Sequence, residues 1–174
     1  MHEKLNAAFD LADSIRYSGD VRLPFQNLSD FQTGEINSHF AQSGLRISKK
    51  LTPDIYDAFQ RVFSHLQINP DAITAYVHSS PETQATCFSD SRHECIIWVT
   101  SSLIKLMSKD ELTFVIGHEL GHFLLGHSLE EKQDTKSEEY LIRSRAQEIS
   151  VDRIGLISCG SLNISIQALM KLVS

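Results

Sequence analysis

Residues 118 to 122 read His-Glu-Leu-Gly-His, a combination of side chains and spacing that can support metal-dependent hydrolysis. On a helix, two histidines four residues apart are separated by about 40° around the axis and ~6 Å along it, so both imidazoles can converge on one cation. Glu119 flanks the same face and can act as a base toward a water molecule there. Zinc requires two such imidazoles, a third protein ligand and an open position. The alternative is an amphipathic core helix that carries two histidines by chance.

The flanking sequence predicts that this segment is a helix over residues 109–127. Ser108 and Glu111 have the spacing of a capping box at its start, and apolar residues follow with helical periodicity at Leu112, Val115, Ile116, Leu120, Phe123 and Leu124. Gly117 and Gly121 are poor helix formers, each costing up to ~1 kcal/mol relative to alanine. We therefore expect another backbone to approach this helix closely.

Glu148, 26 residues after His122, is the best candidate for the third ligand. It falls in a second predicted helix, over about residues 136–158, and shares one helical face with Asp152. We expect Glu148 to bind the metal and Asp152 to accept the second N–H of a ligand histidine. The alternative is a solvated face on which these carboxylates pair with Arg145 and Arg153.

The second helix should begin at a capping box in residues 135–138 and turn an apolar stripe into the core. The predicted stripe consists of Ile142, Ala146, Ile149, Leu156 and Ile157. Residues 128–139 are mostly polar or charged and predict a loop between the two helices.

His127 lies five residues after His122, or about 140° around a helix, so it cannot join the histidine pair unless the helix ends first. We expect it to interact with the last carbonyl groups of the helix.

The run Gly-His-Glu-Leu-Gly-His-Phe-Leu-Leu-Gly-His at 117–127, with Glu-Ile-Ser-Val-Asp-Arg-Ile-Gly at 148–155, resembles the zinc metallopeptidase family of the CAAX prenyl endopeptidases and HtpX-like heat-shock proteases. The resemblance covers about residues 72–174. It implies a gluzincin site in which zinc binds His118, His122 and Glu148, Glu119 is the general base and Asp152 supports a ligand. It also implies a strand, a short helix and a capped start of the zinc helix from Cys95 onward. Val151 replaces the alanine usual in the family.

The fold class expected is α+β, a mainly helical zincin-like domain with a small antiparallel sheet beside the zinc-binding helix. Strands are predicted at 73–78, 85–88 and 94–100. Ile96 and Trp98 alternate with Ile97 and Val99, so both faces of the sheet should be covered.

We expect residues 1–70 to form a helical N-terminal part of the same domain, and residues 71–174 to form the catalytic core. The first part should contain a short helix ending near Gly19, a loop to about residue 50, and a helix from Thr52-Pro53 to Leu66.

Length, net charge and cysteine spacing restrict the partners and the cellular location that we expect for this chain. The 174 residues suit one domain, and a net charge of −6 without a basic stripe argues against nucleic acid as a partner. Neither a signal peptide nor an apolar run long enough to span a membrane is visible, although related proteins are often membrane-associated. Cys87, Cys95 and Cys159 lack metal-type spacing. A cytoplasmic location with reduced cysteines is the simpler expectation, and one disulfide stays open.

The leading interpretation is a zinc-dependent metalloendopeptidase with one zinc ion per chain and a protein or peptide substrate. Arg153, Tyr140 and His78 are candidates for stabilising the oxyanion. Two alternatives are a non-catalytic, zinc-stabilised module that binds peptides or a regulator, and a regulatory protease of the antirepressor type.

Overall fold

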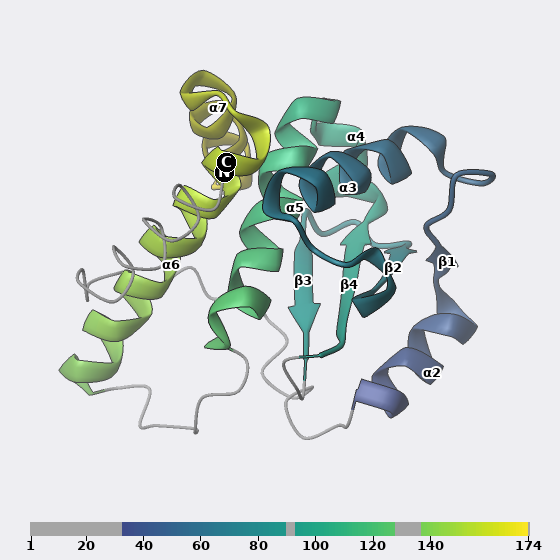
Figure 1. Cartoon of the computed structure of the whole chain (residues 1–174), viewed down its shortest axis with the longest axis horizontal. Helices are drawn as coiled ribbons and strands as arrows, with labels where there is room; N and C mark the ends of the chain where they lie inside the picture. The colour runs from purple at the N-terminus through teal and green to yellow at the C-terminus, as the bar shows by residue number, and fades with distance from the viewer. Residues whose placement is uncertain (1–32, 90–92, 128–136, 174) are drawn as a thin grey trace.

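Two long antiparallel helices, α5 and α6, pack together, and α5 lies between α6 and a four-stranded sheet (Figure 1). The computed structural model describes residues 33–89, 93–127 and 137–173. The α+β class predicted from the sequence is confirmed. In chain order, the elements are α2 (Thr33–Ser43), β1 (Leu45–Arg46), α3 (Pro53–Leu66), the 3-10 helix η2 (Pro70–Ala72), β2 (Ile73–His78), β3 (Ala85–Phe88), β4 (Cys95–Thr100), α4 (Ser101–Leu106), α5 (Lys109–Leu125), α6 (Glu138–Cys159) and α7 (Leu162–Leu172).

Helix α5 begins and ends at caps that the sequence indicated. The Ser108 hydroxyl accepts the N–H of Glu111, and a carboxylate oxygen of Glu111 accepts the N–H of Ser108 at 2.7 Å, which confirms the capping box. At the other end Gly126 adopts a left-handed conformation, with φ of 71°, and its N–H donates to carbonyls of the last turn. The predicted helix is thus confirmed to within two residues.

Glycines allow α5 and α6 to approach each other closely. A Cβ atom at Gly117 would collide with the Ser158 side chain and lie 3.2 Å from the Cα of Gly155. A Cβ atom at Gly121 would lie 3.0 Å from Cγ1 of Val151. The predicted close approach of another backbone is therefore confirmed, and that backbone belongs to α6.

The sheet has the strand order β1-β2-β4-β3 and mixed pairing. Strands β2 and β4 pair in parallel, from Ile73 opposite Cys95 to His78 opposite Thr100, while β1 and β3 pair antiparallel with their neighbours. The predicted strands are confirmed, but the expectation of a wholly antiparallel sheet was wrong. Strand β3 lies outside β4, so β2 and β4 become neighbours that run in the same direction. This order leaves β3 at an edge of the sheet, in contact with α5.

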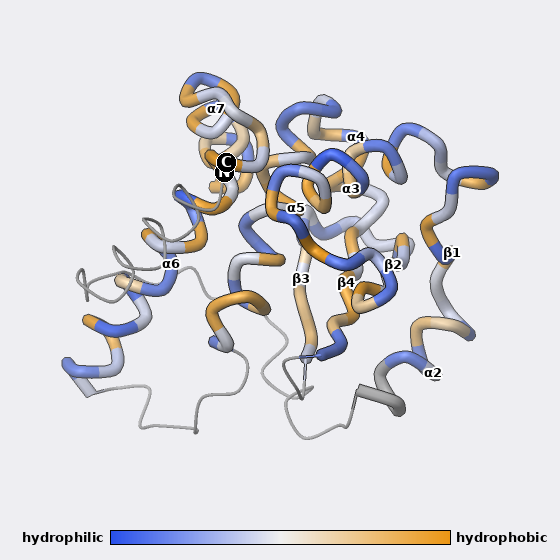
Figure 2. Tube along the Cα trace, viewed as in Figure 1, coloured by the Kyte–Doolittle hydropathy of each residue, from blue (hydrophilic) through white to orange (hydrophobic). Residues whose placement is uncertain are grey.

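Both faces of β4 are buried, as its alternating apolar residues predicted. Ile97 and Val99 belong to the main core, which α3 and α5 help to form, whereas Ile96 and Trp98 pack with Phe40 and Tyr76 on the other face. The apolar segments in Figure 2 accordingly follow β4 and the adjoining helices. All six residues of β4 are buried, which makes this strand the centre of the domain.

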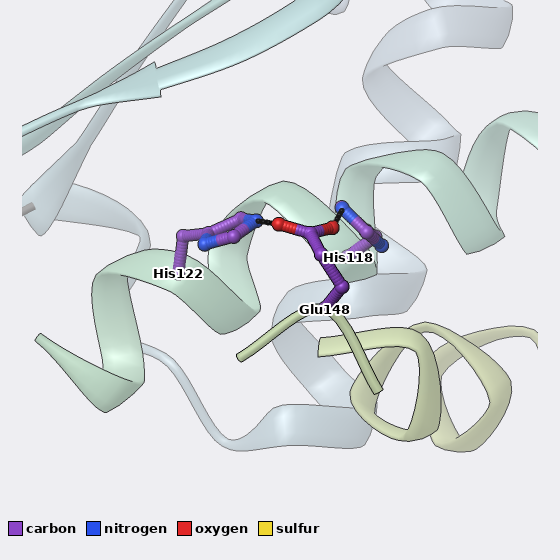
Figure 3. A group of neighbouring side chains, drawn as sticks. All are labelled: His118, His122 and Glu148. Carbon is purple, nitrogen blue, oxygen red and sulfur yellow. Dashed lines mark ion pairs between the residues drawn. The ribbon is translucent and has the colours of Figure 1, made fainter. Parts of the chain in front are cut away.

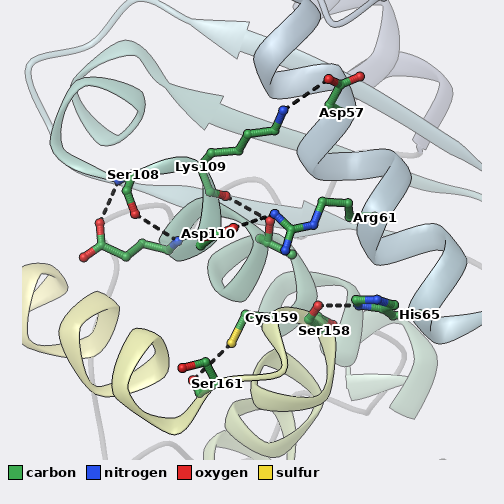
Figure 4. Close-up of polar contacts among 11 residues, drawn as sticks. Asp57, Arg61, His65, Ser108, Lys109, Asp110, Ser158, Cys159 and Ser161 are labelled. Atoms are coloured by element: carbon green, nitrogen blue, oxygen red, sulfur yellow. Dashed lines mark hydrogen bonds and ion pairs between the residues drawn. The ribbon is translucent and has the colours of Figure 1, made fainter.

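Helix α3 is joined to α5 by two ion pairs at its surface. Lys109 donates to Asp57 at 3.1 Å, and Arg61 pairs with Asp110 (Figure 4). These side chains are 40 to 54% exposed, so each pair contributes at most about 1 kcal/mol. The burial of Phe59 and Val62 between α3 and the rest of the core supplies the main attachment.

The N-terminal part differs from the prediction in two places. The helix from residue 53 to residue 66 is confirmed, but the loop expected up to about residue 50 contains α2 and β1. Helix α2 covers the outer face of the sheet through Phe40, which is 5% exposed. The expected helix before Gly19 and the first part of that loop lie outside the described residues, as do residues 128–136 of the predicted loop between α5 and α6.

The register of the buried face of α6 also differs from the prediction. The helix is present, with Ser137 as its N-cap, but Ile149 is 37% exposed and the buried residues are mostly small. They are Ala146, Ser150, Val151, Ile154, Gly155 and Ser158. The predicted apolar stripe was therefore only partly right: Ala146 is buried and Ile157 packs against the core, but Ile149 is exposed. The close contact with α5 accommodates small side chains better than large ones. Helix α7, which packs on α5 and α6, was not predicted.

Two further features concern the cysteines and the lengths of the helices. Cys87 of β3 and Cys95 of β4 form a disulfide, so the alternative of one disulfide describes this structure better than three reduced cysteines. Among the helices of the described residues, none combines the length and the apolar character that crossing a membrane requires.

Candidate metal centre

His118 and His122 of α5 meet Glu148 of α6 in one group of potential metal ligands (Figure 3). Nε2 of His118 lies 3.4 Å from Oε2 of Glu148, and Nε2 of His122 lies 3.7 Å from Oε1. One ligand atom from each residue falls within 4.8 Å of the others. Ligands about 2.0–2.2 Å from a tetrahedral zinc ion stand roughly 3.3–3.5 Å apart, so small side-chain movements would close this set around a metal.

Each imidazole directs Nε2 toward Glu148 and has its other nitrogen in a hydrogen bond. Nδ1 of His118 lies 3.0 Å from Oδ1 of Asp152, and Nδ1 of His122 lies 3.0 Å from Nδ1 of His127. The Asp152 contact matches the prediction that this carboxylate supports a ligand histidine. Hydrogen bonds at Nδ1 keep Nε2 available to a metal and orient the ring.

Glu119 lies beside this group at the boundary between α5 and the sheet. Its Oε2 accepts the backbone N–H of Cys87, on the edge strand β3, at 3.1 Å. The contact ties the candidate base to the strand next to the site. It was not foreseen, because a backbone donor carries no residue-type signal in the sequence.

Neighbouring groups shift the pKa values of His118 and Glu148 in opposite directions. Burial lowers the pKa of His118, but hydrogen bonds to Asp152 and Glu148, together with the charge of Glu119, outweigh it and raise that pKa to about 10. Burial would raise the pKa of Glu148, yet the hydrogen bond and charge of His118 hold it below the ordinary value. Both shifts favour a charged pair of a His118 imidazolium and a Glu148 carboxylate. A proton and a metal ion would compete for the same imidazole.

The pKa values of His122 and Glu119 shift in the direction that burial favours. Burial, reinforced by the charge of His118, lowers the pKa of His122 to about 3, which keeps this imidazole neutral and able to ligate. Burial, with the nearby charge of Glu148, raises the pKa of Glu119 to about 7, although His118 and the Cys87 N–H act in the opposite sense.

Two expectations about individual residues need correction. His127 was expected to interact with the last carbonyls of the helix, but its ring contacts His122. The left-handed Gly126 ends α5 and turns the chain back; the glycine was a signal for this turn. His78, a candidate for the oxyanion, packs against Phe40 and Trp98 on the sheet face opposite the main core. The roles suggested for Tyr140 and Arg153 stay predictions.

A family model supports what the geometry suggests. The model for peptidase family M48 matches residues 49–140, which is more than half of the chain. The chain belongs to peptidase family M48. The match includes His118, Glu119 and His122 and ends before Glu148. M48 proteins are metal-dependent peptidases, and the group of His118, His122 and Glu148 can bind a metal ion.

The chain is also similar to one curated protein, the "Plastoglobule-localized metallopeptidase 48, chloroplastic" of Arabidopsis thaliana. The two are 28% identical over 124 residues, which cover 60% of this chain and 36% of that protein. The chain therefore spans only about a third of the length of this relative. No solved structure matches the chain. Of the two peptidase families considered from the sequence, the M48 match favours that of the E-x-x-x-D motif over the antirepressor type.

Proposed function

We propose that this chain is a zinc-dependent endopeptidase that hydrolyses peptide bonds of proteins or peptides. One zinc ion would be held by His118, His122 and Glu148, with Glu119 as the general base. The observation that carries the proposal is the convergence of two histidines and one carboxylate from two helices, whose candidate ligand atoms lie within 4.8 Å of one another. Membership of family M48 supports the same reaction class.

The donor set suits zinc well. Two imidazoles and one carboxylate are a common set of protein ligands at catalytic zinc sites, where a fourth position is left for water or substrate. Both Nδ1 atoms are engaged by protein partners, so the Nε2 atoms are the ones presented to the ion. A bound zinc ion would supply Lewis acidity, which activates water and stabilises negative charge on the substrate carbonyl.

The chain itself would move the proton through Glu119. The Cys87 N–H holds Oε2 of this carboxylate, which leaves Oε1 to take a proton from the attacking water. The same oxygen then delivers the proton to the leaving amine, so that the base is regenerated when the peptide bond breaks. His118 and His122 flank Glu119 on α5, and the helix therefore fixes the distance between base and ligands.

Strand β3 offers a place for the substrate. It is an edge strand of the described sheet, contacts α5, and contributes the backbone of Cys87 to Glu119. An extended peptide can add to such an edge through main-chain hydrogen bonds, which recognise the peptide without reading its sequence. This arrangement would place the scissile carbonyl beside Glu119. The alternative is that the sheet only covers the helix pair.

The test compares Glu119→Gln with the wild-type chain. Glutamine keeps the shape of the side chain and removes the base, so we expect unchanged metal content and a loss of casein or peptide-library cleavage of at least ~100-fold. Glu139→Gln, at an exposed position in the first turn of α6, is the matched control and should cleave normally. Wild-type cleavage should stop with a chelator and return with zinc. Retained turnover by purified Glu119→Gln would refute the base assignment. Metal binding without cleavage by the wild type would favour a non-catalytic module.

A further inference from the structure

The two candidate histidine ligands are supported by different partners. His118 is held at Nδ1 by the carboxylate of Asp152, whereas His122 is held at Nδ1 by another imidazole, that of His127. The rings of His122 and His127 have their centroids 5.1 Å apart and are inclined by 72°. An edge-to-face arrangement of this kind suits an N–H of one ring directed at the lone pair of the other.

His127 can contact His122 because α5 ends at Leu125, two residues before His127. A residue five positions after His122 would lie about 140° away around a continuing helix. Helix α5 instead stops at Leu125, and Gly126 takes a φ of 71° while its N–H donates to the carbonyls of His122 and Phe123. This turn returns His127, which is half-buried, to the same side as His122.

We propose that His127 is the positioning residue for His122. Its Nδ1 accepts the Nδ1–H of His122, fixing the ring and the tautomer in which Nε2 presents its lone pair toward Glu148. This inference rests on the proposed metal site and deepens it. A metal at Nε2 leaves Nδ1 as the only nitrogen of His122 that can carry a proton, so His122 must donate and His127 must accept. His127 then carries its own proton on Nε2.

The proposal predicts that zinc affinity depends on a hydrogen-bond acceptor at position 127 and does not depend on an imidazole ring there. In His127→Asn, the amide oxygen can reach about the place of Nδ1 and accept the same proton. In His127→Leu, the side chain has a similar size and no acceptor. Loss of a hydrogen bond behind a ligand histidine typically weakens metal binding ~10–100-fold. The leucine variant should show this loss, and asparagine should restore affinity to within a few-fold of wild type.

Two readouts test the proposal, with His39→Ala as a control at an exposed histidine of α2. Zinc affinity is measured by competition with a chelator. In the zinc-loaded protein, imidazole nitrogen NMR then reports the His122 Nδ1–H, which should be protected in wild type and His127→Asn and lost to rapid exchange in His127→Leu. His127→Ala replaces the leucine variant if the latter does not fold. A merely structural role would lower unfolding temperature without changing the His122 proton.

The outcomes separate this proposal from the proposed function. If the wild type binds zinc and His127→Leu matches it in affinity and in the His122 signal, His127 is not the positioning residue, although the metal site stands. An asparagine variant as defective as the leucine variant would overturn the acceptor role in the same way. If the wild type binds no zinc, the proposed function falls and the role of His127 falls with it.

Discussion

The carboxylate of Asp152 lies 3.0 Å from Nδ1 of His118, across the interface between α6 and α5, and only four residues after Glu148 on the same helix. One turn of α6 therefore supplies both Glu148, a candidate ligand, and Asp152, which contacts a second candidate ligand, His118. The consequence is that the candidate site depends on the register between the two helices. A shift of α6 by one residue would move both carboxylates away from the histidines together.

Asp152→Ala should weaken zinc binding without removing a ligand. The Nδ1 of His118 would lose its acceptor, and we expect an affinity ~10–100-fold lower, with Asp152→Asn falling between alanine and wild type. Chelator competition measures this effect. Asp71→Ala, at an exposed aspartate of η2, is the control. An alanine variant with wild-type affinity would show that Asp152 does not orient the ligand.

Glu148→Ala should remove the third ligand and with it most of the bound metal. The wild-type chain is expected to carry about one zinc ion, and the variant much less than one after dialysis against a weak chelator. Elemental analysis of the two purified proteins gives the ratio of metal to chain. Glu139→Ala, at an exposed site on the same helix, should keep its metal. Full occupancy in Glu148→Ala would mean that another residue completes the site.

Gly117→Ala should destabilise the fold and the candidate site together. The added methyl group would collide with the Ser158 side chain, which is fully buried and hydrogen-bonded to the carbonyl of Ile154 at 2.8 Å. Overpacking of this kind typically costs ~1–3 kcal/mol, and separation of α5 from α6 should also weaken zinc binding. Urea unfolding and chelator competition measure the two effects.

A double variant distinguishes this collision from a general effect of alanine in the helix. Ser158→Gly removes the atoms that the new methyl group would meet, so Gly117→Ala should cost less in that background than in the wild type. Equal costs in the two backgrounds would show that the contact between these two residues does not limit the packing.

The sequence predicted those parts of the structure that local signals determine. The capping box of Ser108 and Glu111 marked the start of α5, and the His-Glu-Leu-Gly-His run marked the face that meets Glu148. Gly117 and Gly121 predicted a close neighbour, because two glycines are unfavourable in a helix unless the space of a Cβ is needed.

The parts that were missed depend on tertiary contacts. The sequence of a single strand does not determine which strand will pair with β4. The alternation of apolar residues alone therefore could not predict the parallel pairing with β2. The buried face of α6 consists of small residues such as Ser150 and Ser158, and a search for large apolar side chains selected Ile149 instead. Helix α7 carried a signal that was overlooked: Gly160 ends α6, and Ser161 caps the next helix.

Lys171→Met should destabilise the chain in a pH-dependent way. Glu111 is 3% exposed, and Lys171 of α7 donates to its Oε2 at 2.7 Å. Burial raises the pKa of Glu111, but the hydrogen bonds from Lys171 and Ser108 outweigh it and hold that pKa below the ordinary value. The charged carboxylate therefore stabilises the fold at pH values above its unfolded pKa of ~4.3, and this contribution is lost as the pH falls through the lower, folded pKa.

Removal of the Lys171 ammonium leaves the buried carboxylate without its cation, which should cost ~1–3 kcal/mol at pH 7. The cost should shrink once Glu111 is protonated, because a neutral carboxyl group needs no cation. Urea unfolding from pH 7 down to about 3 measures the difference between variant and wild type. Lys105→Met, at an exposed position in α4, should show no such trend. The ammonium also donates to the carbonyl of Leu106 at 3.1 Å, a contact that is independent of the charge on Glu111. A difference that stays constant across the pH range would therefore exclude the ion pair with Glu111 as the source of the lost stability.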